Sequence, residues 1–209
     1  MRSLWCCHPV AFIEHLKKLV NRPELIWAKK IIEIHGKEKG EQILCKVADI
    51  CKEMGFDPNY LMACMAFETG EEFSSSTLNA AGSGAVGLIQ FMPSTATDLK
   101  TTTDYLKNLD EVSQLDWVKK YFKRQMGSRK ITTLTDVYMA ILYPSLIGKS
   151  DNAVFADRNA EGNSKAARLS RLRYTQNRGL DKNNNGIITK VEISGKILSK
   201  FEKGKKFIG

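Results

Sequence analysis

The amino-acid sequence predicts a mainly α-helical protein, on three observations. Apolar residues recur every three or four positions along most of the 209 residues, which is the spacing of one face of a helix. Proline and aspartate stand where several of these runs begin, and glycine stands where several end. Only the short apolar run at residues 86–91 has any strand character. A chain of this length can form one substantial core, or a core with a small appendage.

The predicted helices follow one another through short loops. They cover residues 9–20, 23–35, 42–54, 57–68, 94–99, 110–126, 133–142, 164–176 and 190–201. Pro23 suits the first turn of the second helix, Gly36 suits its end, and Asp57 suits the cap of the fourth. Residues 71–93 lose the helical spacing and are predicted to be loop, and residues 151–163 are predicted to be a polar connection.

This order predicts three segments. They are N-terminal helices packed on the core at residues 1–54, a central domain at residues 55–163 and a basic helix–loop–helix at residues 164–209. The formal net charge is +9, and residues 165–209 alone carry 12 Lys and Arg against 3 Asp and Glu. A basic surface favours polyanions such as nucleic acid, anionic lipid or cell-wall polymer. No nucleic-acid-binding motif is recognisable, so nucleic acid is not an expected partner.

Five cysteines, an odd number without the spacing of a disulfide framework, predict reduced thiols and synthesis in a reducing compartment. The run Cys6-Cys7-His8 has no partner pair elsewhere, which argues against a metal site there. His8 and Pro9 interrupt the apolar stretch at residues 4–13, and no run is long enough to cross a membrane. We therefore expect synthesis in the cytoplasm without a signal peptide.

The most informative stretch is residues 84–96, which read Gly-Ala-Val-Gly-Leu-Ile-Gln-Phe-Met-Pro-Ser-Thr-Ala. Its glycines allow the backbone to approach a ligand closely. Upstream, Glu68 closes an otherwise apolar helical run. A carboxyl in apolar surroundings resists ionisation and can serve as a general acid near neutral pH. This chemistry points to cleavage of a glycosidic bond.

These motifs resemble the catalytic domain of the soluble lytic transglycosylases, within the lysozyme-like superfamily. Residues 68–70 match the Glu-Ser-Gly element of that family with Thr69 in place of Ser, and residues 87–93 match its Gly-Leu-Met-Gln-Leu-Met-Pro element. Residues 140–144 match its Ala-Tyr-Asn element, with Pro144 in place of Asn. The resemblance covers roughly residues 55–165. It implies a lysozyme-like domain of the goose-type or lytic transglycosylase kind, acting on the glycan strands of peptidoglycan.

The resemblance also implies roles for single residues. Glu68 is the expected catalytic residue, and Gln90, Gly87 and Tyr143 are expected in the substrate site. Glu68 protonates the oxygen between N-acetylmuramic acid and N-acetylglucosamine, and then takes the proton of the muramic C6 hydroxyl, which attacks C1 to form a 1,6-anhydro ring. Gln90 orients an N-acetyl group or the Glu68 carboxyl, or is only a polar residue at a strand edge. Gly87 shapes the turn, and Tyr143 bonds to Glu68 or to an unrelated partner.

Two other interpretations share these motifs. A muramidase admits water to the same cleft and normally needs a second carboxylate. The available carboxylates carry no motif; they are Glu71, Glu72, Asp98, Asp104 and Asp110. The other interpretation is a non-catalytic protein that binds the wall or calcium and has an inactive lysozyme-like cleft.

A second motif, at residues 181–192, matches the EF-hand calcium loop at positions 1, 3, 5, 6 and 12. The loop offers oxygen ligands from Asp181, Asn183, Asn185, the Ile187 carbonyl, Thr189 or a water, and Glu192. Only two of these side chains are carboxylates and the surroundings are basic, so we expect a structural Ca²⁺ of modest affinity. The alternative is an Asn-rich loop that no longer binds metal.

A transglycosylase-like motif together with an EF-hand-like loop resembles a bacteriophage endolysin or a virion-associated wall hydrolase. We expect a monomer that is made in the host cytoplasm, leaves it through a membrane pore or by injection, and acts on the wall in the periplasm. The basic C-terminal region is expected to hold the enzyme against anionic wall polymer or lipopolysaccharide.

Overall fold

The computed structural model describes residues 23–209, and the predicted mainly α-helical class is confirmed there. The helices are α2 (Ala28–His35), α3 (Lys37–Met54), α4 (Pro58–Glu68), α5 (Pro93–Asp98), α6 (Thr103–Lys107), α7 (Glu111–Met126), α8 (Leu134–Leu142), α9 (Lys165–Asn177) and α10 (Lys190–Gly204). Single 3-10 turns follow three of them: η2 (Pro144–Leu146), η3 (Arg178–Leu180) and η4 (Lys205–Phe207). The helix predicted at residues 9–20 and the Cys6-Cys7-His8 run lie outside the described residues. No helix in the described part is long and apolar enough to cross a bilayer.

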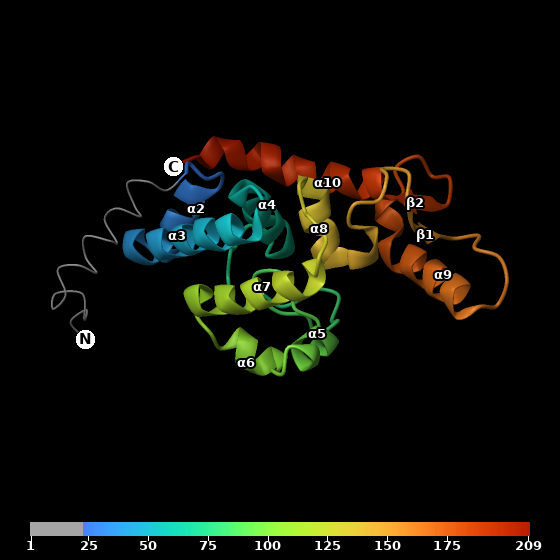
Figure 1. Cartoon of the computed structure of the whole chain (residues 1–209), viewed down its shortest axis with the longest axis horizontal. Coiled ribbons are helices and arrows are strands. Elements are labelled where there is room, and N and C mark those ends of the chain that lie inside the picture. Colours follow the sequence, from blue (N-terminus) through green and yellow to red (C-terminus); the bar gives the residue numbers. More distant parts are fainter. Residues whose placement is uncertain (1–22) are drawn as a thin grey trace.

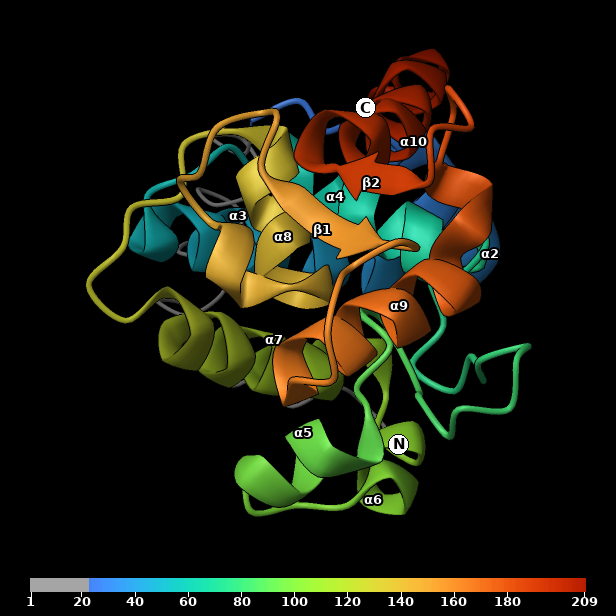
Figure 2. The ribbon, with the colours of Figure 1, turned by 90° about the vertical axis from the view of Figure 1, so that its right-hand side faces the viewer.

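The helices pack around α4 and α8. α10 runs along one edge of the molecule and packs against both of them (Figure 1). α3 lies against α2, α4 and α7, and the short helices α5 and α6 lie beyond α7. The strands β1 (Val154–Asp157) and β2 (Ile187–Thr189) lie with α9 at the end away from α2, the end that faces the viewer in Figure 2.

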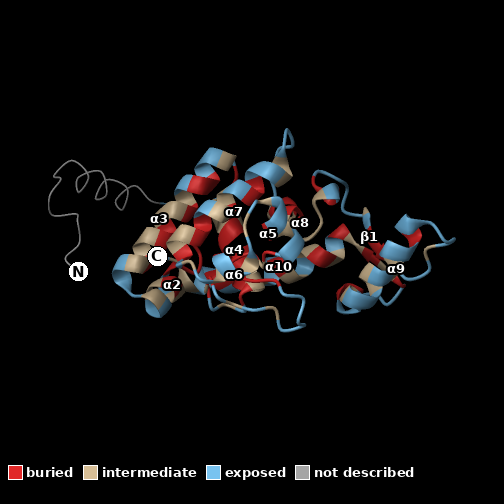
Figure 3. Cartoon of the chain, turned by 90° about the horizontal axis from the view of Figure 1, so that it is seen from below, coloured by how far each residue is buried: buried red, intermediate tan, exposed pale blue. Residues whose placement is uncertain are grey.

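One hydrophobic core joins these elements. Ile31, Val47, Leu61, Phe122 and Ile197 are fully buried in it and come from five different helices. Figure 3 shows the buried residues on the inner faces of the helices and the exposed ones on their outer faces. Because the core draws on all three predicted segments, the N-terminal helices and the C-terminal helix complete the interior of the central segment.

The start of α4 follows from local chemistry. Asp57 caps the helix as predicted, because its carboxylate accepts a hydrogen bond from the Asn59 N–H at 2.8 Å. Pro58 occupies the first turn, where its missing N–H costs nothing. Gly36 ends α2 as predicted, with a φ of 80° that favours glycine. Asp57 and Pro58 thus fix the start of α4, the helix that carries Glu68.

The prediction that Pro23 begins a helix was wrong. α2 begins only at Ala28, because Trp27 takes the left-handed region with a φ of 65°. The Trp27 indole is fully buried and lies against Gly204, where a Cβ would overlap it. Tertiary packing of the C-terminal helix therefore sets this helix start, and local spacing does not.

The strand pair also lies away from its predicted place. β1 and β2 are antiparallel, with Ala156 opposite Ile188, whereas residues 86–91 form only isolated bridges. β1 falls inside the predicted polar connection at residues 151–163, and β2 falls inside the loop motif at residues 181–192. Both Ala156 and Ile188 are fully buried. Pairing across the chain makes these strands, and each is too short to show an alternating pattern.

A buried ion pair fastens α10 to α8. Lys190 Nζ lies 2.7 Å from Asp136 Oδ1 and donates to the Lys149 carbonyl at 2.8 Å. The Asp136 carboxylate also accepts from the Gly148 N–H at 3.0 Å. Removing one partner of such a pair costs about 3–5 kcal/mol, because the other charge stays buried. The C-terminal segment is therefore tied to the core by charge as well as by apolar contacts.

Candidate active site

Glu68 is the last residue of α4, after six buried residues at 61–66. Its own side chain is partly exposed at the end of this apolar helix. Burial raises the pKa of the Glu68 carboxyl to about 8. At neutral pH this carboxyl therefore carries a proton, as a general acid requires.

The hydroxyl that meets Glu68 belongs to Tyr138 of α8. Tyr138 hydrogen-bonds to the Glu68 carboxyl, which favours the charged carboxylate and partly offsets the effect of burial on its pKa. Burial and the charge of Glu68 raise the pKa of Tyr138, so its hydroxyl keeps its hydrogen and donates. The ring is held edge-on against Phe67, with the ring centres 5.3 Å apart. The contact predicted for Tyr143 is thus made by Tyr138.

Tyr143 lies at the end of α8 in a different environment. A hydrogen bond from Ser145, opposed by partial burial and helped by Arg173, lowers the pKa of its hydroxyl. The Tyr143 ring meets Phe155 of β1 edge-on, with the centres 5.4 Å apart. Tyr143 therefore faces the part of the molecule formed by β1 and α9.

Tyr121 of α7 joins Glu68 to the glycine-rich motif. Burial, and then the charge of Glu68, raise the pKa of Tyr121, so the two groups share one apolar environment. The Tyr121 ring meets Phe91 edge-on at 6.0 Å, and its hydroxyl donates to the Ala140 carbonyl at 2.8 Å. Tyr121 thus contacts Phe91, the neighbour of Gln90, and also lies within the electrostatic influence of Glu68.

Gln90 has a backbone φ of 52°, in the left-handed region. Its side-chain amide donates to the Thr77 carbonyl and to the Gly87 carbonyl, both at 3.1 Å. These two bonds engage both amide hydrogens and hold the loop closed. The Gln90 amide oxygen is then the part of the side chain that can accept a bond from a ligand.

Gly87 permits a close approach to a buried glutamine that the sequence did not single out. Gly87 has a φ of 80°, and a Cβ there would overlap the Gln114 amide. Gln114 is fully buried and accepts from the Leu88 N–H at 2.8 Å. Its amide nitrogen donates to Ser75 O at 2.9 Å and to Leu106 O at 2.8 Å. Gly87 therefore lets one side chain of α7 hold two loops together.

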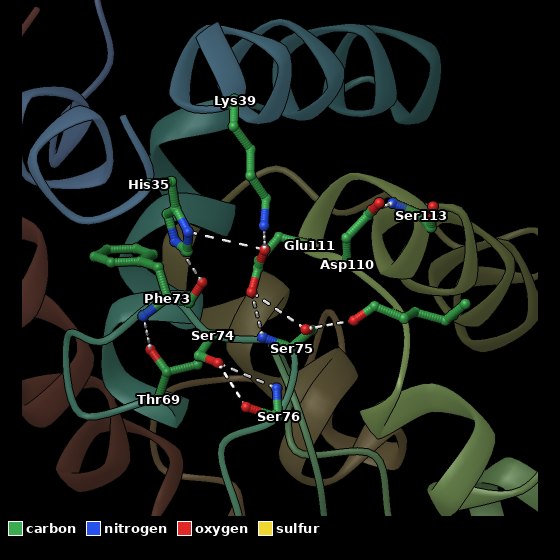
Figure 4. Close-up of polar contacts among 11 residues, drawn as sticks. His35, Lys39, Thr69, Phe73, Ser74, Ser75, Ser76, Asp110, Glu111 and Ser113 are labelled. Carbon is green, nitrogen blue, oxygen red and sulfur yellow. Dashed lines mark hydrogen bonds and ion pairs between the residues drawn. The ribbon is translucent and has the colours of Figure 1, made fainter. Parts of the chain in front are cut away.

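A polar network fixes the chain where it leaves Glu68 (Figure 4). The Thr69 hydroxyl accepts from the Phe73 N–H at 3.0 Å, and His35 Nε2 lies 3.0 Å from the Phe73 carbonyl. The Glu111 carboxylate accepts from Ser75, through the N–H at 3.1 Å and the hydroxyl at 3.2 Å. These bonds hold the loop on α2 and α7.

Glu111 itself is buried but ionised. Burial opposes its charge, but the Lys39 ammonium and the Ser75 N–H outweigh that effect and lower the pKa of Glu111. Lys39 makes a direct ion pair with its second oxygen (Figure 4). The Glu111 carboxylate is thus committed to the fold and is not free to act as a base.

The other carboxylates considered for a second catalytic role also have partners or lie exposed. Glu71 is ion-paired with Lys200 and Lys203 of α10, and these lysines outweigh burial and lower its pKa. The remaining carboxylates are Asp98 beside Arg124, Asp104 beside Lys107, Asp110 as the cap of α7, and the exposed Glu72. Burial and the Tyr138 hydroxyl are the influences on the pKa of Glu68, and neither is a carboxylate.

Residues 181–192 fold as a loop, a short strand and the first turn of a helix. β2 takes positions 7–9 of the loop motif, and α10 begins at position 10. Gly186, at position 6, has a φ of 88°. Asn183 accepts from the Asn185 N–H at 2.9 Å, and Asn185 accepts from the Ile187 N–H at 2.8 Å. These short turns order the predicted ligand side chains at positions 3 and 5.

The two carboxylates of the loop lie at the same end of it. Asp181 accepts from the Gly186 N–H at 2.9 Å and from the Tyr174 hydroxyl at 2.8 Å. Glu192, at position 12, reaches back to the Lys182 N–H at position 2, with a distance of 3.0 Å. The loop is therefore closed, with its first and last predicted ligands near each other.

Both carboxylates are held in the charged form that a cation needs. Burial opposes ionisation of Asp181, but Tyr174 and the backbone N–H groups outweigh it and lower its pKa. Thr189 and the loop backbone do the same for Glu192. No group of three or more His, Cys, Asp or Glu side chains gathers within residues 23–209. A cation here would need the Asn side chains and the Ile187 carbonyl as well.

Much of the C-terminal positive charge is engaged within the fold. Lys190, Lys200 and Lys203 form ion pairs with core carboxylates. Arg171 donates to the Gly162 carbonyl at 3.1 Å. The exposed cations of this region include Lys165, Arg168, Arg178, Lys182 and Lys206. The basic surface is thus smaller than the sequence count suggests.

Comparisons of the chain with protein-family models, with curated proteins and with solved structures found no match. The candidate site therefore rests on its own geometry. Tyr138 is the member that the sequence analysis missed. A signal was present, because Tyr138 stands between the fully buried Val137 and Met139, and a tyrosine hydroxyl among apolar residues needs a partner.

Proposed function

We propose that this chain is a peptidoglycan-degrading enzyme that cleaves the β-1,4 bond between N-acetylmuramic acid and N-acetylglucosamine, with Glu68 as the catalytic residue. The observation that carries this proposal is the position of Glu68 at the end of a buried apolar helix beside the Tyr138 hydroxyl, where burial raises its pKa to about 8. A carboxyl that is protonated at neutral pH and partly exposed can deliver its proton to a glycosidic oxygen. The Gln90 loop, joined to it through Phe91 and Tyr121, supplies an acceptor for an N-acetyl group.

One carboxyl can perform both proton transfers. Glu68 gives its proton to the bridging oxygen as the bond from muramic C1 to that oxygen breaks. The resulting carboxylate takes the proton of the C6 hydroxyl while the C6 oxygen bonds to C1. The products are a 1,6-anhydromuramic end and an N-acetylglucosamine with a free 4-hydroxyl, and Glu68 is protonated again. Water is not consumed.

We favour this lyase reaction over hydrolysis by a muramidase. Hydrolysis by two carboxylates needs the second one at a defined distance of roughly 5–9 Å from the first. Glu71, the nearest in sequence, is neutralised by Lys200 and Lys203. In the lyase reaction the C6 hydroxyl of the same sugar attacks C1, so no second carboxylate is needed to activate a water molecule.

Mass spectrometry of the muropeptides released from purified peptidoglycan tests the proposal. Products that end in 1,6-anhydromuramic acid are expected from the wild-type protein and not from Glu68→Gln. Products heavier by one water, with a reducing end, would establish a muramidase. Release of nothing by the wild type, with calcium present, would favour the non-catalytic binding protein.

Glu72→Gln is the matched control for Glu68→Gln. Glu72 is exposed, lies four residues further along the chain, and undergoes the same replacement of a carboxyl by an amide. Its turnover should equal that of the wild type. Equal loss in both variants would mean that the acid is elsewhere.

We propose, in addition, that residues 181–192 bind a structural Ca²⁺. Asp181 and Glu192 are both ionised and lie at one end of the loop, and Asn183 and Asn185 are ordered beside them. Two carboxylates, two amide oxygens and a carbonyl suit the preference of Ca²⁺ for hard oxygen ligands. Since α10 begins within this loop, the ion would stabilise the helix that packs on α4 and α8.

A further inference from the structure

Tyr174 of α9 reaches the loop at residues 181–192 from outside it. Its hydroxyl donates to Asp181 Oδ2 at 2.8 Å. α9 packs on β1, which pairs with the loop strand β2 (Figure 2). Ser170 lies one turn before Tyr174 on the same helix face, and its hydroxyl oxygen accepts from the Asp157 N–H of β1 at 2.9 Å. The place of the Tyr174 hydroxyl is therefore set by the packing of α9 on β1.

The hydrogen bonds to Asp181 distinguish its two carboxylate oxygens. Oδ2 accepts from the Tyr174 hydroxyl and from the Gly186 N–H at 2.9 Å, which engages both of its lone pairs. Oδ1 accepts from the Asn185 N–H at the longer distance of 3.2 Å. Asp181 is buried and stands at position 1 of the loop motif. Oδ1 is therefore the oxygen of Asp181 that is available to a cation.

We propose that Tyr174 is a positioning residue of the calcium site, whose hydroxyl holds Oδ2 of Asp181 and so keeps Oδ1 available to the ion. The inference rests on the proposed binding of Ca²⁺ by residues 181–192. Without this hydroxyl, the Gly186 N–H alone would hold Oδ2, and the carboxylate could rotate more freely. By reciprocity, a bound ion would hold Tyr174, and with it α9, against the loop.

Calorimetric titration of the full chain with Ca²⁺ tests this role through Tyr174→Phe. The variant removes the hydroxyl and keeps the ring, together with the contact of the ring with Arg158, whose guanidinium carbon lies 5.7 Å from the ring centre. The dissociation constant for Ca²⁺ should rise about 10-fold, the lower end of the loss found when a hydrogen-bond partner of a metal ligand is removed. At one fixed calcium concentration, the rise in Tm caused by calcium should therefore be smaller in the variant than in the wild type.

Two further variants separate the hydroxyl from the ring. Tyr105→Phe is the matched control, because it removes the same hydroxyl from a tyrosine that is 52% exposed on α6, and it should bind Ca²⁺ as the wild type does. Tyr174→Leu removes the ring as well, so it should lower the calcium-free Tm more than Tyr174→Phe does, while it weakens calcium binding by a similar factor. Calcium binding that weakens only in Tyr174→Leu would assign the effect to the ring and overturn the role of the hydroxyl.

Hydrogen exchange of the α9 amides distinguishes positioning from support of the fold. α9 contains none of the predicted calcium ligands, so an effect of calcium on its exchange reports the link through Tyr174. Calcium should slow this exchange in the wild type, and slow it less in Tyr174→Phe. A variant that loses calcium-free stability but keeps the wild-type dissociation constant and the wild-type response of α9 would make Tyr174 only a support of the fold.

Failure of the calcium proposal can be recognised separately. If the wild type shows neither heat of calcium binding nor a rise in Tm, residues 181–192 bind no Ca²⁺, and the role of Tyr174 is overturned together with that proposal. If the wild type binds Ca²⁺ and Tyr174→Phe binds it equally well, the calcium site holds and only the role of Tyr174 is overturned.

Discussion

Tyr138 donates a hydrogen bond to Glu68, across the contact between α8 and α4. Two opposing effects meet at this bond. Burial keeps the proton on Glu68, and the Tyr138 hydroxyl favours the carboxylate that remains after the proton has left. The result is a pKa of about 8, which leaves the acid protonated at neutral pH but able to transfer its proton.

Tyr138→Phe should move the pH dependence of turnover. Loss of the hydroxyl removes the influence that lowers the pKa of Glu68, so this pKa should rise above about 8. The acid must be protonated, so activity falls as pH rises through that value, and the alkaline limb should move to higher pH. Turnover at neutral pH should fall about 10-fold or more, because the carboxylate formed in the reaction loses a donor worth roughly 1.5–3 kcal/mol. The measurement is kcat/KM against pH.

Tyr105→Phe is the control for that profile. Tyr105 is 52% exposed and lies on α6, away from Glu68. Its variant should follow the wild-type curve. An alkaline limb that stays in place in Tyr138→Phe would show that Glu68 does not set it.

Glu68→Gln should stabilise the fold, and more so at higher pH. Between about 4.5 and 8 the folded protein keeps a proton on Glu68 that the unfolded chain has lost, so raising the pH favours unfolding. Gln does not titrate, so the variant lacks this loss of stability with rising pH. The gain at pH 8 should be on the order of 2 kcal/mol after allowance for partial exposure, and it should vanish near pH 4. Urea unfolding at both pH values measures it, and an equal difference at the two would contradict the raised pKa.

Gly87→Ala should destabilise the loop of Gln90 and reduce turnover. Its φ of 80° disfavours a side chain, and the added methyl would overlap the buried Gln114 amide. The two effects together should cost about 2–4 kcal/mol. Gly82→Ala is the matched control. Gly82 has a φ of 71° with open space around it, so the added methyl there costs only the backbone strain. An equal loss of thermal stability in the two variants would mean that the Gln114 side chain moves to accommodate the methyl.

Calcium should raise the thermal stability of the wild type. At 100 times the dissociation constant the ion adds about 2.7 kcal/mol, or roughly 5–10 °C in Tm for a chain of this size. Glu192→Gln should abolish the shift, because it removes one of the two charges while leaving an oxygen to cap α10. Glu161→Gln, at an exposed site outside the loop, should keep it. If millimolar calcium does not raise the Tm of the wild type, residues 181–192 are an Asn-rich loop that does not bind the metal.

The helices were largely predictable, because their causes are local. The spacing of apolar residues and the Asp57 cap fix α4, and with it the place of Glu68 at a helix end. The same reasoning failed at Pro23, since the start of α2 depends on the contact of Trp27 with Gly204 far along the chain. Burial of a helix end against a distant segment leaves no periodic signal.

In the candidate site, too, the local features were predictable from the sequence and the contacts between helices were not. The sequence indicated Glu68 and the Gln90 loop, because an isolated carboxyl after an apolar helix and a glycine-rich turn are both local patterns. It offered Tyr143 as a partner of Glu68 or of an unrelated group, whereas in the structure the hydroxyl that bonds to Glu68 belongs to Tyr138. Choosing between Tyr138 within α8 and Tyr143 just after it requires knowing which face of α8 meets α4, and that is a property of packing.

The sequence by itself determined the mainly helical class, the place of the candidate acid Glu68 at a helix end and the order of the oxygen-bearing side chains in the loop at residues 181–192. Only the tertiary structure decided that burial raises the pKa of Glu68, that Glu71 is neutralised by α10, and that the Arg173 guanidinium lies over the Tyr143 ring. The physical reason is that helix caps and apolar spacing act within a few residues. Desolvation, ion pairing and stacking depend on groups that come together only when distant segments pack.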